Sequence, residues 1–209
     1  MVHKIGVSSV ALGLAIALLA FWVISGFQQN IEAKLTSFRG QLQITQYSLN
    51  RSYEEPPIQV DKVQGIQQAF PDYIKEIQVF AHKTALLKTA AAVEGVVCKG
   101  LAPQVSHERL TNYLTAGRLV VFPQAGYSHE IVLSSKTAAR LQLQIGDEVT
   151  ACMVQQPPRY RKLRVVGIYT TYLEELDEKL AFCDLRLIQR LNDWPDTLVG
   201  GFEVFLHDT

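Results

Sequence analysis

The residue types that most often carry out chemistry are present in this chain, but they form no recognisable catalytic pattern. The five histidines are scattered, and none belongs to an HExxH motif or stands at ligand spacing from a paired acid. The sequence contains neither a GxSxG motif nor a glycine-rich phosphate loop. Ser134 is better explained as the N-cap of a helix from Lys136 to Leu141 than as a nucleophile. We therefore expect no catalytic residue, no cofactor and no enzyme activity.

Two polar segments could instead bind an ion or a partner. The acidic cluster Glu174, Glu175, Asp177 and Glu178 could bind a cation, but a solvated loop between a strand and a helix explains it better, because hard cations need ligands at fixed loop positions. Four neighbouring residues are predicted to form an exposed hairpin tip: Pro157, Pro158, Arg159 and Tyr160. They are candidate partner contacts, with a plain turn as the alternative. We expect no metal site.

Cysteine usage argues against a metal-binding or disulfide-framework protein, and the charge balance argues against a nucleic-acid-binding protein. Cys98, Cys152 and Cys183 are widely separated, and their odd number argues against a metal site or a disulfide framework. One pair could bridge in an oxidising compartment, but buried apolar residues are the preferred interpretation. The 20 basic and 20 acidic residues balance, and no basic run occurs, which argues against nucleic-acid binding.

The uncharged run from Ile5 to Phe27 predicts a membrane-spanning helix. About 20 apolar residues are enough to cross a bilayer, whereas the apolar part of a cleaved signal peptide has about 7–15. The run also continues without a break into a helical pattern that places Phe27, Ile31, Leu35 and Phe38 on one face. Basic residues near its two ends are nearly balanced, so charge alone does not set the orientation. A short inner N-terminus and a large outer domain is the simplest topology.

The rest of the chain alternates between strands and short helices, which predicts an α+β fold with antiparallel and mixed sheets. We expect strands over 41–47 and 201–208, with a strand meander over 73–102. We expect helices at Asp61–Phe70 (N-cap Asp61), His107–Gly117, Lys136–Leu141 and Leu185–Asn192 (N-cap Asp184). The first and last thirds share a strand–helix–strand character, and the middle third resembles an insertion.

Several segments in this order resemble the FtsX/MacB-type ABC transporter permeases, most closely the lipoprotein-releasing subunits of the LolC/LolE type. The segments are SGFQQNIEAKL, QLQIT, EGVVCKG, EIVLSSKTAARLQLQIGDEV, RKLRVVGIYTTYLEELDEKLAFCDLRLIQRLN and GFEVFLHD. The resemblance covers nearly the whole chain and lies in the order and spacing of weak motifs. It implies four membrane helices with a large periplasmic domain between the first two. Because the chain ends at Thr209, before the other three helices, we expect a fragment of such a subunit.

The resemblance also implies how the chain is divided. A transmembrane helix and stalk occupy residues 1–38, and a two-lobed periplasmic domain follows. A Porter-like lobe comprises residues 39–102 and 162–209, and a Sabre-like lobe is inserted between them at residues 103–161. The LolC-type subunits carry an extended hairpin that recruits the carrier, but the matching place here is only the short VQQPPRYRKL turn, which departs from that pattern and argues against direct carrier recruitment by this subunit.

The function that the resemblance implies is that of a non-catalytic permease subunit in a bacterial inner membrane, with most of the chain in the periplasm. ATP-driven closure of a cytoplasmic ATPase would move the stalk, and the stalk would transmit this movement to the periplasmic lobes, which release lipoproteins from the membrane. The implied partners are this ATPase, a second permease subunit, lipoprotein cargo and a periplasmic carrier. Alternatives are a MacB-like efflux subunit, an FtsX-like regulator of cell-wall hydrolases, and a single-span periplasmic sensor or binding module.

One face of the apolar helix is the candidate cargo site. Phe21, Ile24, Phe27 and Ile31 recur at helical spacing. The resemblance implies that they line a cavity for the acyl chains of the lipoprotein. The alternative is that they only face lipid, since residues in contact with lipid need no protein partner.

Overall fold

The computed structural model describes residues 2–49, 53–63, 65–103 and 108–207. The chain divides into two compact units, residues 1–37 and 38–209. The first unit consists of helix α1 (Val2–Arg39), whose last two residues belong to the second unit. Within α1, residues Val10–Arg39 are long and apolar enough to cross a membrane, and the apolar window of this segment is not buried by protein. The predicted long apolar helix is therefore confirmed.

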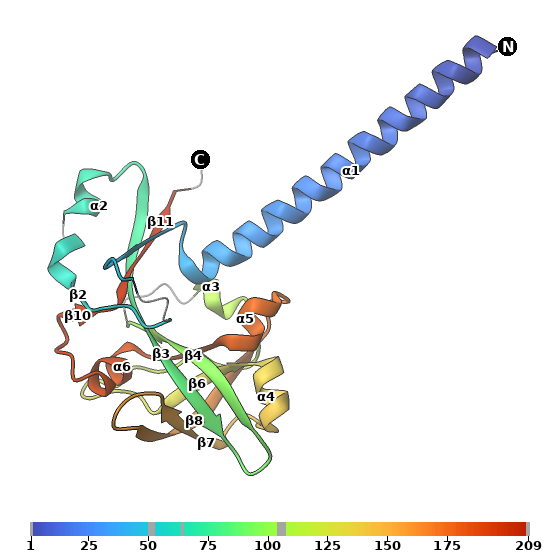
Figure 1. The fold of residues 1–209 in the computed structure, drawn as a ribbon. Coiled ribbons are helices and arrows are strands. Elements are labelled where there is room, and N and C mark those ends of the chain that lie inside the picture. Colours follow the sequence, from blue (N-terminus) through green and yellow to red (C-terminus); the bar gives the residue numbers. More distant parts are fainter. Residues whose placement is uncertain (1, 50–52, 64, 104–107, 208–209) are drawn as a thin grey trace. The chain divides into compact units, whose positions relative to one another are not determined.

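The second unit is built on a nine-stranded mixed sheet (Figure 1). Its strands run in the spatial order β1 (Leu42–Thr45), β11 (Gly201–Leu206), β3 (Ile74–Lys88), β4 (Val93–Leu101), β9 (Leu180–Asp184), β6 (Glu130–Ser134), β8 (Arg159–Tyr169) and β5 (Leu114–Gly117). The ninth strand, β7 (Glu148–Met153), pairs with both β3 and β8. The α+β fold class is confirmed.

Because β7 bridges β3 and β8, six strands close into a ring. The pairings run from β3 through β4, β9, β6, β8 and β7 back to β3. Small and branched apolar residues fill the ring, among them Ala85, Cys98, Leu133, Ala151, Leu163 and Cys183. Cys98 and Cys183 are buried and all three cysteines are free, which agrees with the preferred interpretation for these two.

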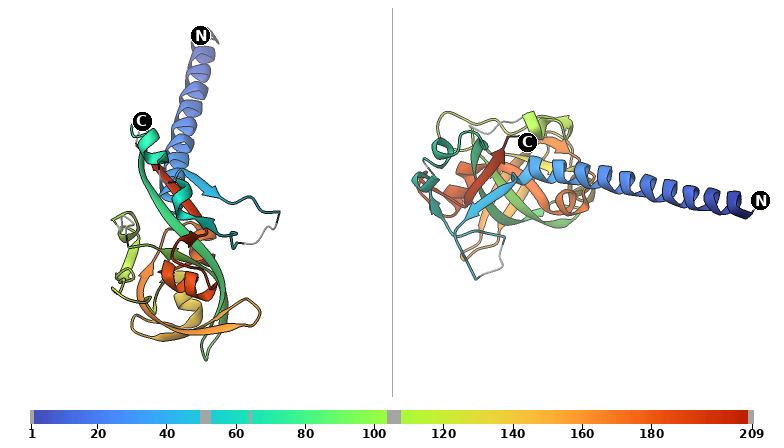
Figure 2. Two further views of the ribbon diagram at one scale, coloured as in Figure 1. Left: turned by 90° about the vertical axis from the view of Figure 1, so that its left-hand side faces the viewer. Right: turned by 90° about the horizontal axis from the view of Figure 1, so that it is seen from above.

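Strand β3 connects this ring to the outer strands β11 and β1. Its first half pairs with β11 as far as Phe80, and its second half pairs with β4 from Ala81 onwards. The left view of Figure 2 shows β3 in green as one long strand along the second unit. The pairing therefore changes partner within β3.

The predicted lobe boundaries at 103 and 161 do not coincide with a break in the sheet formed by the described residues. Strand β8 continues across residue 161, and β9 on one side of the proposed insertion pairs with β6 inside it. Strand β7, also inside the insertion, pairs with β3. The division of residues 39–209 into functional lobes at these positions stays a prediction.

Two predicted helices form as expected because their sequences supply their own N-caps. The side chain of Ser134 accepts a hydrogen bond from the backbone N–H of Thr137 at the start of α4 (Ser135–Leu141). Asp184 accepts one from the N–H of Arg186 at the start of α6 (Leu185–Leu191). Strands β1 and β11 also lie within the predicted strands.

Two other predicted helices are corrected. The region predicted as one helix over 61–70 contains η1 (Val60–Val63) and α2 (Ile66–Ala69), next to the pair β2 (Ile58–Gln59) and β10 (Leu198–Val199). Gly65 has a φ of 104°, which no helix accommodates. Of the helix predicted over 107–117, whose first residue lies outside the described residues, only α3 (Glu108–Thr111) is helical, because β5 pairs with β8.

Candidate functional site

The candidate site lies at the first residue of the second unit, where α1 ends. Phe38 is 1% exposed, although most of α1 is exposed. Its ring centroid lies 4.9 Å from that of Tyr113, 6.0 Å from that of Tyr169 and 5.9 Å from that of Phe182. These three rings come from the segment after α3, the end of β8 and the middle of β9. Residues far apart in the sequence therefore hold the end of the helix in an aromatic cluster.

A buried ion pair lies beside this aromatic cluster. The Lys99 Nζ atom is 2.7 Å from each carboxylate oxygen of Glu203, and both side chains are about 95% or more buried. The same Nζ atom donates a hydrogen bond to the carbonyl oxygen of Phe38. Gln43 donates to Glu203 from β1 at 3.1 Å. A carbonyl group at a helix C-terminus lacks an intrahelical hydrogen-bond donor, and the negative end of the helix dipole favours a nearby cation. The ammonium group of Lys99 provides both the donor and the positive charge.

A tight turn then leads the chain from α1 into β1. Gly40 has a φ of 68°, and a Cβ atom there would lie 2.8 Å from the carbonyl oxygen of Val204. The N–H of Gln41 donates to that same oxygen at 3.1 Å. Only glycine fits this position without strain, because other residues would meet both the left-handed backbone and the contact with β11. The end of α1 is thus joined to β4 by the Lys99 side chain, and the turn that follows α1 is joined to β11 by backbone.

Tyr169 extends the site towards α5 (Glu174–Lys179). Its hydroxyl group donates to the carbonyl oxygen of Leu180 at 2.8 Å and also lies 3.2 Å from the carbonyl oxygen of Leu176. Burial, together with the nearby carboxylate of Asp177, raises the pKa of Tyr169 far above its ordinary value. The hydroxyl therefore stays protonated and remains a donor at every physiological pH.

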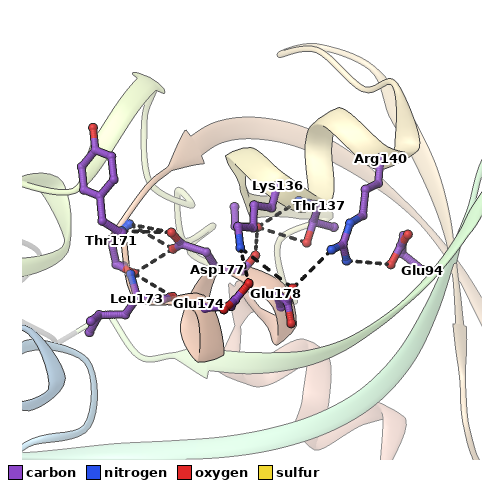
Figure 3. Close-up of polar contacts among 11 residues, drawn as sticks. Glu94, Lys136, Thr137, Arg140, Thr171, Leu173, Glu174, Asp177 and Glu178 are labelled. Atoms are coloured by element: carbon purple, nitrogen blue, oxygen red, sulfur yellow. Dashed lines mark hydrogen bonds and ion pairs between the residues drawn. The ribbon is translucent and has the colours of Figure 1, made fainter.

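Figure 3 shows that the acidic cluster is a helix held in place by hydrogen bonds and ion pairs, so the predicted solvated loop is wrong. The buried carboxylate of Asp177 accepts bonds from the N–H and hydroxyl groups of Thr171 at 2.9 and 2.8 Å and from the N–H of Tyr172 at 3.0 Å. Ser134 donates to the carbonyl oxygen of Asp177. These contacts hold α5 against the segment that follows β8 and against the end of β6.

Two other acidic residues of this cluster, Glu174 and Glu178, form ion pairs with basic residues of α4. Lys136 lies 3.1 Å from Glu174, and Arg140 lies 3.3 Å from Glu178 (Figure 3). Within the described part of the chain, no group of three or more histidine, cysteine or acidic side chains could hold a metal ion. The cluster therefore ties α5 to α4.

The predicted cargo residues lie in the first unit, on α1. Phe21, Ile24 and Phe27 are 57–66% exposed, and Ile31 is partly exposed. The uninterrupted helix gives them the predicted spacing along one face. Nothing in the structure tests whether they line a cavity, so this assignment stays a prediction.

The predicted partner-contact residues lie at and after the β7–β8 turn and differ in their exposure. Pro157, Pro158 and Tyr160 are exposed. The guanidinium group of Arg159 instead lies 2.5 and 3.0 Å from the carboxylate of Asp193 and 2.9 Å from the carbonyl oxygen of Leu191. The hydrogen bonds from Arg159 lower the pKa of Asp193. Arg159 thus fastens the turn to the end of α6, and any partner would meet the other three residues.

Sequence reasoning placed Phe38 on the apolar face of the helix but missed the pairing of Lys99 with Glu203. The two residues are 104 positions apart and lie in two separate segments, EGVVCKG and GFEVFLHD, whose spacing does not relate them. The only signal was their position within predicted strands, where a charged residue on a buried face is unusual.

Comparisons with known proteins agree with this fold. A family profile described as the MacB-like periplasmic core domain matches residues 6–200. No curated protein matches the chain. One similar solved structure is the extracellular domain of the noncanonic ABC-type transporter YknZ from Gram-positive bacteria, with a TM-score of 0.53 and 13% identity, covering 80% of this chain and 85% of that one. Another is the periplasmic region of MacB from Actinobacillus actinomycetemcomitans, with a TM-score of 0.53 and 12% identity, covering 79% and 73%.

The profile match covers the apolar part of α1 and nearly all of the sheet. Core domains of this kind are non-catalytic modules of permeases, which confirms the prediction that the chain is not an enzyme. The match over most of the chain and the shared fold lead to the same conclusion: the chain belongs to the family of MacB-like periplasmic core domains.

Proposed function

We propose that the chain is the membrane-anchored periplasmic part of a permease subunit in an FtsX/MacB-type ABC exporter of a bacterial inner membrane. The observation that carries this proposal is the family match, which includes an apolar helix and the sheet domain in one continuous segment. The length and composition of α1 support membrane anchoring. A cytoplasmic ATPase and a second permease subunit are the partners that such a role requires.

In this proposal, the site at Phe38 passes movement from the helix to the sheet. Any displacement of α1 along its axis acts through the covalent chain on Phe38. Its ring and carbonyl group are held by β4, β8 and β9, so these strands receive the force. Interiors are close-packed and transmit strain, and an anchor of this kind therefore suits a mechanical role better than a flexible linker does.

We further propose that the exporter releases lipoproteins from the inner membrane and that the face formed by Phe21, Ile24, Phe27 and Ile31 receives their acyl chains. Acyl chains need apolar walls, and each buried methylene group contributes about 0.8 kcal/mol. The exposed residues Pro157, Pro158 and Tyr160 are proposed partner contacts, with Arg159 holding the turn in place.

The variant Ile24→Asp tests the proposed cargo site. In the complete transporter it should lower lipoprotein release several-fold, because a charge on this face opposes the entry of an acyl chain. Assembly with the ATPase should persist. Photocrosslinkers at Ile24 and Phe27 should capture lipoprotein more strongly than one at Leu12, which lies deeper in the apolar run.

Normal release by Ile24→Asp would contradict the cargo site, as would equal capture at all three positions. Either result would leave only contact with lipid for this face. Capture of small molecules in place of lipoprotein would favour the efflux alternative.

A further inference from the structure

We propose that β1 is a dimerisation strand, whose outer edge pairs antiparallel with β1 of a second copy of this chain. The inference rests on the proposed function in one respect, namely that a permease dimer holds two such domains on the same membrane. It goes beyond that function by naming the surface through which the two periplasmic domains join.

The first observation is the position of β1 in the sheet. It is the end strand of the spatial order, and within the described residues it pairs only with β11. Backbone N–H and C=O groups alternate between the two sides of a strand. The groups of β1 that point away from β11 therefore form an open edge, which is a template for another strand.

The second observation is that the sequence does not protect this edge. Natural edge strands carry lysine, proline, inward-pointing charges or bulges that discourage pairing. Residues 40–50 (GQLQITQYSLN) contain no charged residue and no proline. The register between β1 and β11 is regular from Leu42 to Thr45, so no bulge turns the edge aside. The edge is thus free of the usual obstacles to pairing.

The third observation is the exposure of large apolar side chains in the same segment. Leu42 is 57% exposed, and Tyr47 and Leu49, which follow the strand, are 84% and 88% exposed. Neighbouring exposed apolar residues are typical of interaction surfaces, and tyrosine is enriched there. Pairing of two β1 strands would remove part of this surface from water.

A second copy is the occupant that this chemistry fits. An uncharged edge is complementary to itself, because antiparallel pairing about a twofold axis brings no like charges together. The strand begins at Leu42, three residues after α1 ends at Arg39. Two copies anchored by α1 in one membrane would therefore hold their β1 strands at high effective concentration, which strengthens a contact as short as this strand.

Charge substitution on the edge tests this proposal in the full chain, reconstituted in lipid nanodiscs or detergent micelles. Leu42→Lys combined with Tyr47→Lys should weaken dimerisation at least tenfold, measured by single-molecule photobleaching or sedimentation. Both side chains are exposed, so the fold should persist, as circular dichroism would verify. The matched control is Val93→Lys, which alters an equally exposed apolar residue (55%) on β4 and should leave dimerisation unchanged.

Cysteine crosslinking gives a second and independent readout. Single cysteines at Gln43, Ile44 and Thr45 are introduced in a Cys152→Ser background, since Cys98 and Cys183 are buried. At least one β1 position should form an intermolecular disulfide. A cysteine at Thr115 on β5, the strand at the other end of the order, should not. Dimers that form without β1 crosslinks and survive the lysine variants would overturn the inference, as would a purely monomeric chain. The first of these results leaves the proposed function intact, because dimerisation would then occur through α1.

Discussion

Replacing Phe38 with alanine should reduce the free energy of unfolding of the second unit by about 3–5 kcal/mol, the usual loss for a fully buried phenylalanine. The ring is 1% exposed and contacts three aromatic rings, so its removal leaves a cavity lined by Tyr113, Tyr169 and Phe182. Urea unfolding of the full chain in detergent would measure the change. The signal is the fluorescence of Trp194, which packs against the core, in a Trp22→Phe background.

Phe70→Ala is the matched control for this variant. Phe70 is 55% exposed, so its truncation should change stability by no more than about 0.5 kcal/mol. If Phe38→Ala lowered the free energy of unfolding as little as Phe70→Ala, Phe38 would not anchor the helix end to the sheet.

The second large effect is expected at the buried ion pair. Lys99→Met or Glu203→Met alone should cost about 3–5 kcal/mol, because each leaves the remaining charge buried without a partner. The double variant Lys99→Met/Glu203→Met should cost much less than the sum of the single variants, since apolar residues can replace a buried pair. A double-mutant cycle on urea unfolding measures this coupling.

An exposed pair provides the comparison. Lys136 and Glu174 lie 3.1 Å apart, but their side chains are 41% and 76% exposed. Their removal should change stability by about 0–1 kcal/mol. Additive single effects at Lys99 and Glu203 would show that the two residues do not act as a pair, and the account of how the Phe38 carbonyl group is capped would then fail.

The elements that could be predicted from sequence are those whose signals are local. The long helix followed from an uncharged run, and α4 and α6 followed from Ser134 and Asp184 placed directly before helical patterns. The strand β11 followed from simple alternation. In the helices, neighbouring residues supply the determining interactions, whereas for β11 the local alternation marks the strand although its partners β1 and β3 are distant.

The features that could not be predicted depend on distant partners. Residues 114–117 have a helical pattern but form β5, because β8 offers a backbone ladder about 50 residues away in the sequence. Closure of the ring depends on β7 pairing with β3 across more than 60 residues. The site itself joins Phe38, Lys99 and Glu203, and no local spacing relates these three residues.

The most direct test of the central claim is a labelling measurement on cells that express the chain. The claim is that α1 spans the inner membrane and the second unit stands in the periplasm. In a Cys152→Ser background, Val93→Cys provides an exposed thiol on the second unit, and His3→Cys provides one before the apolar run. A membrane-impermeant maleimide added to intact spheroplasts should label Val93→Cys and not His3→Cys, and the labelled protein should stay with the membrane after an alkaline carbonate wash. Labelling of His3→Cys with protection of Val93→Cys, or release of the labelled protein by carbonate, would contradict the account.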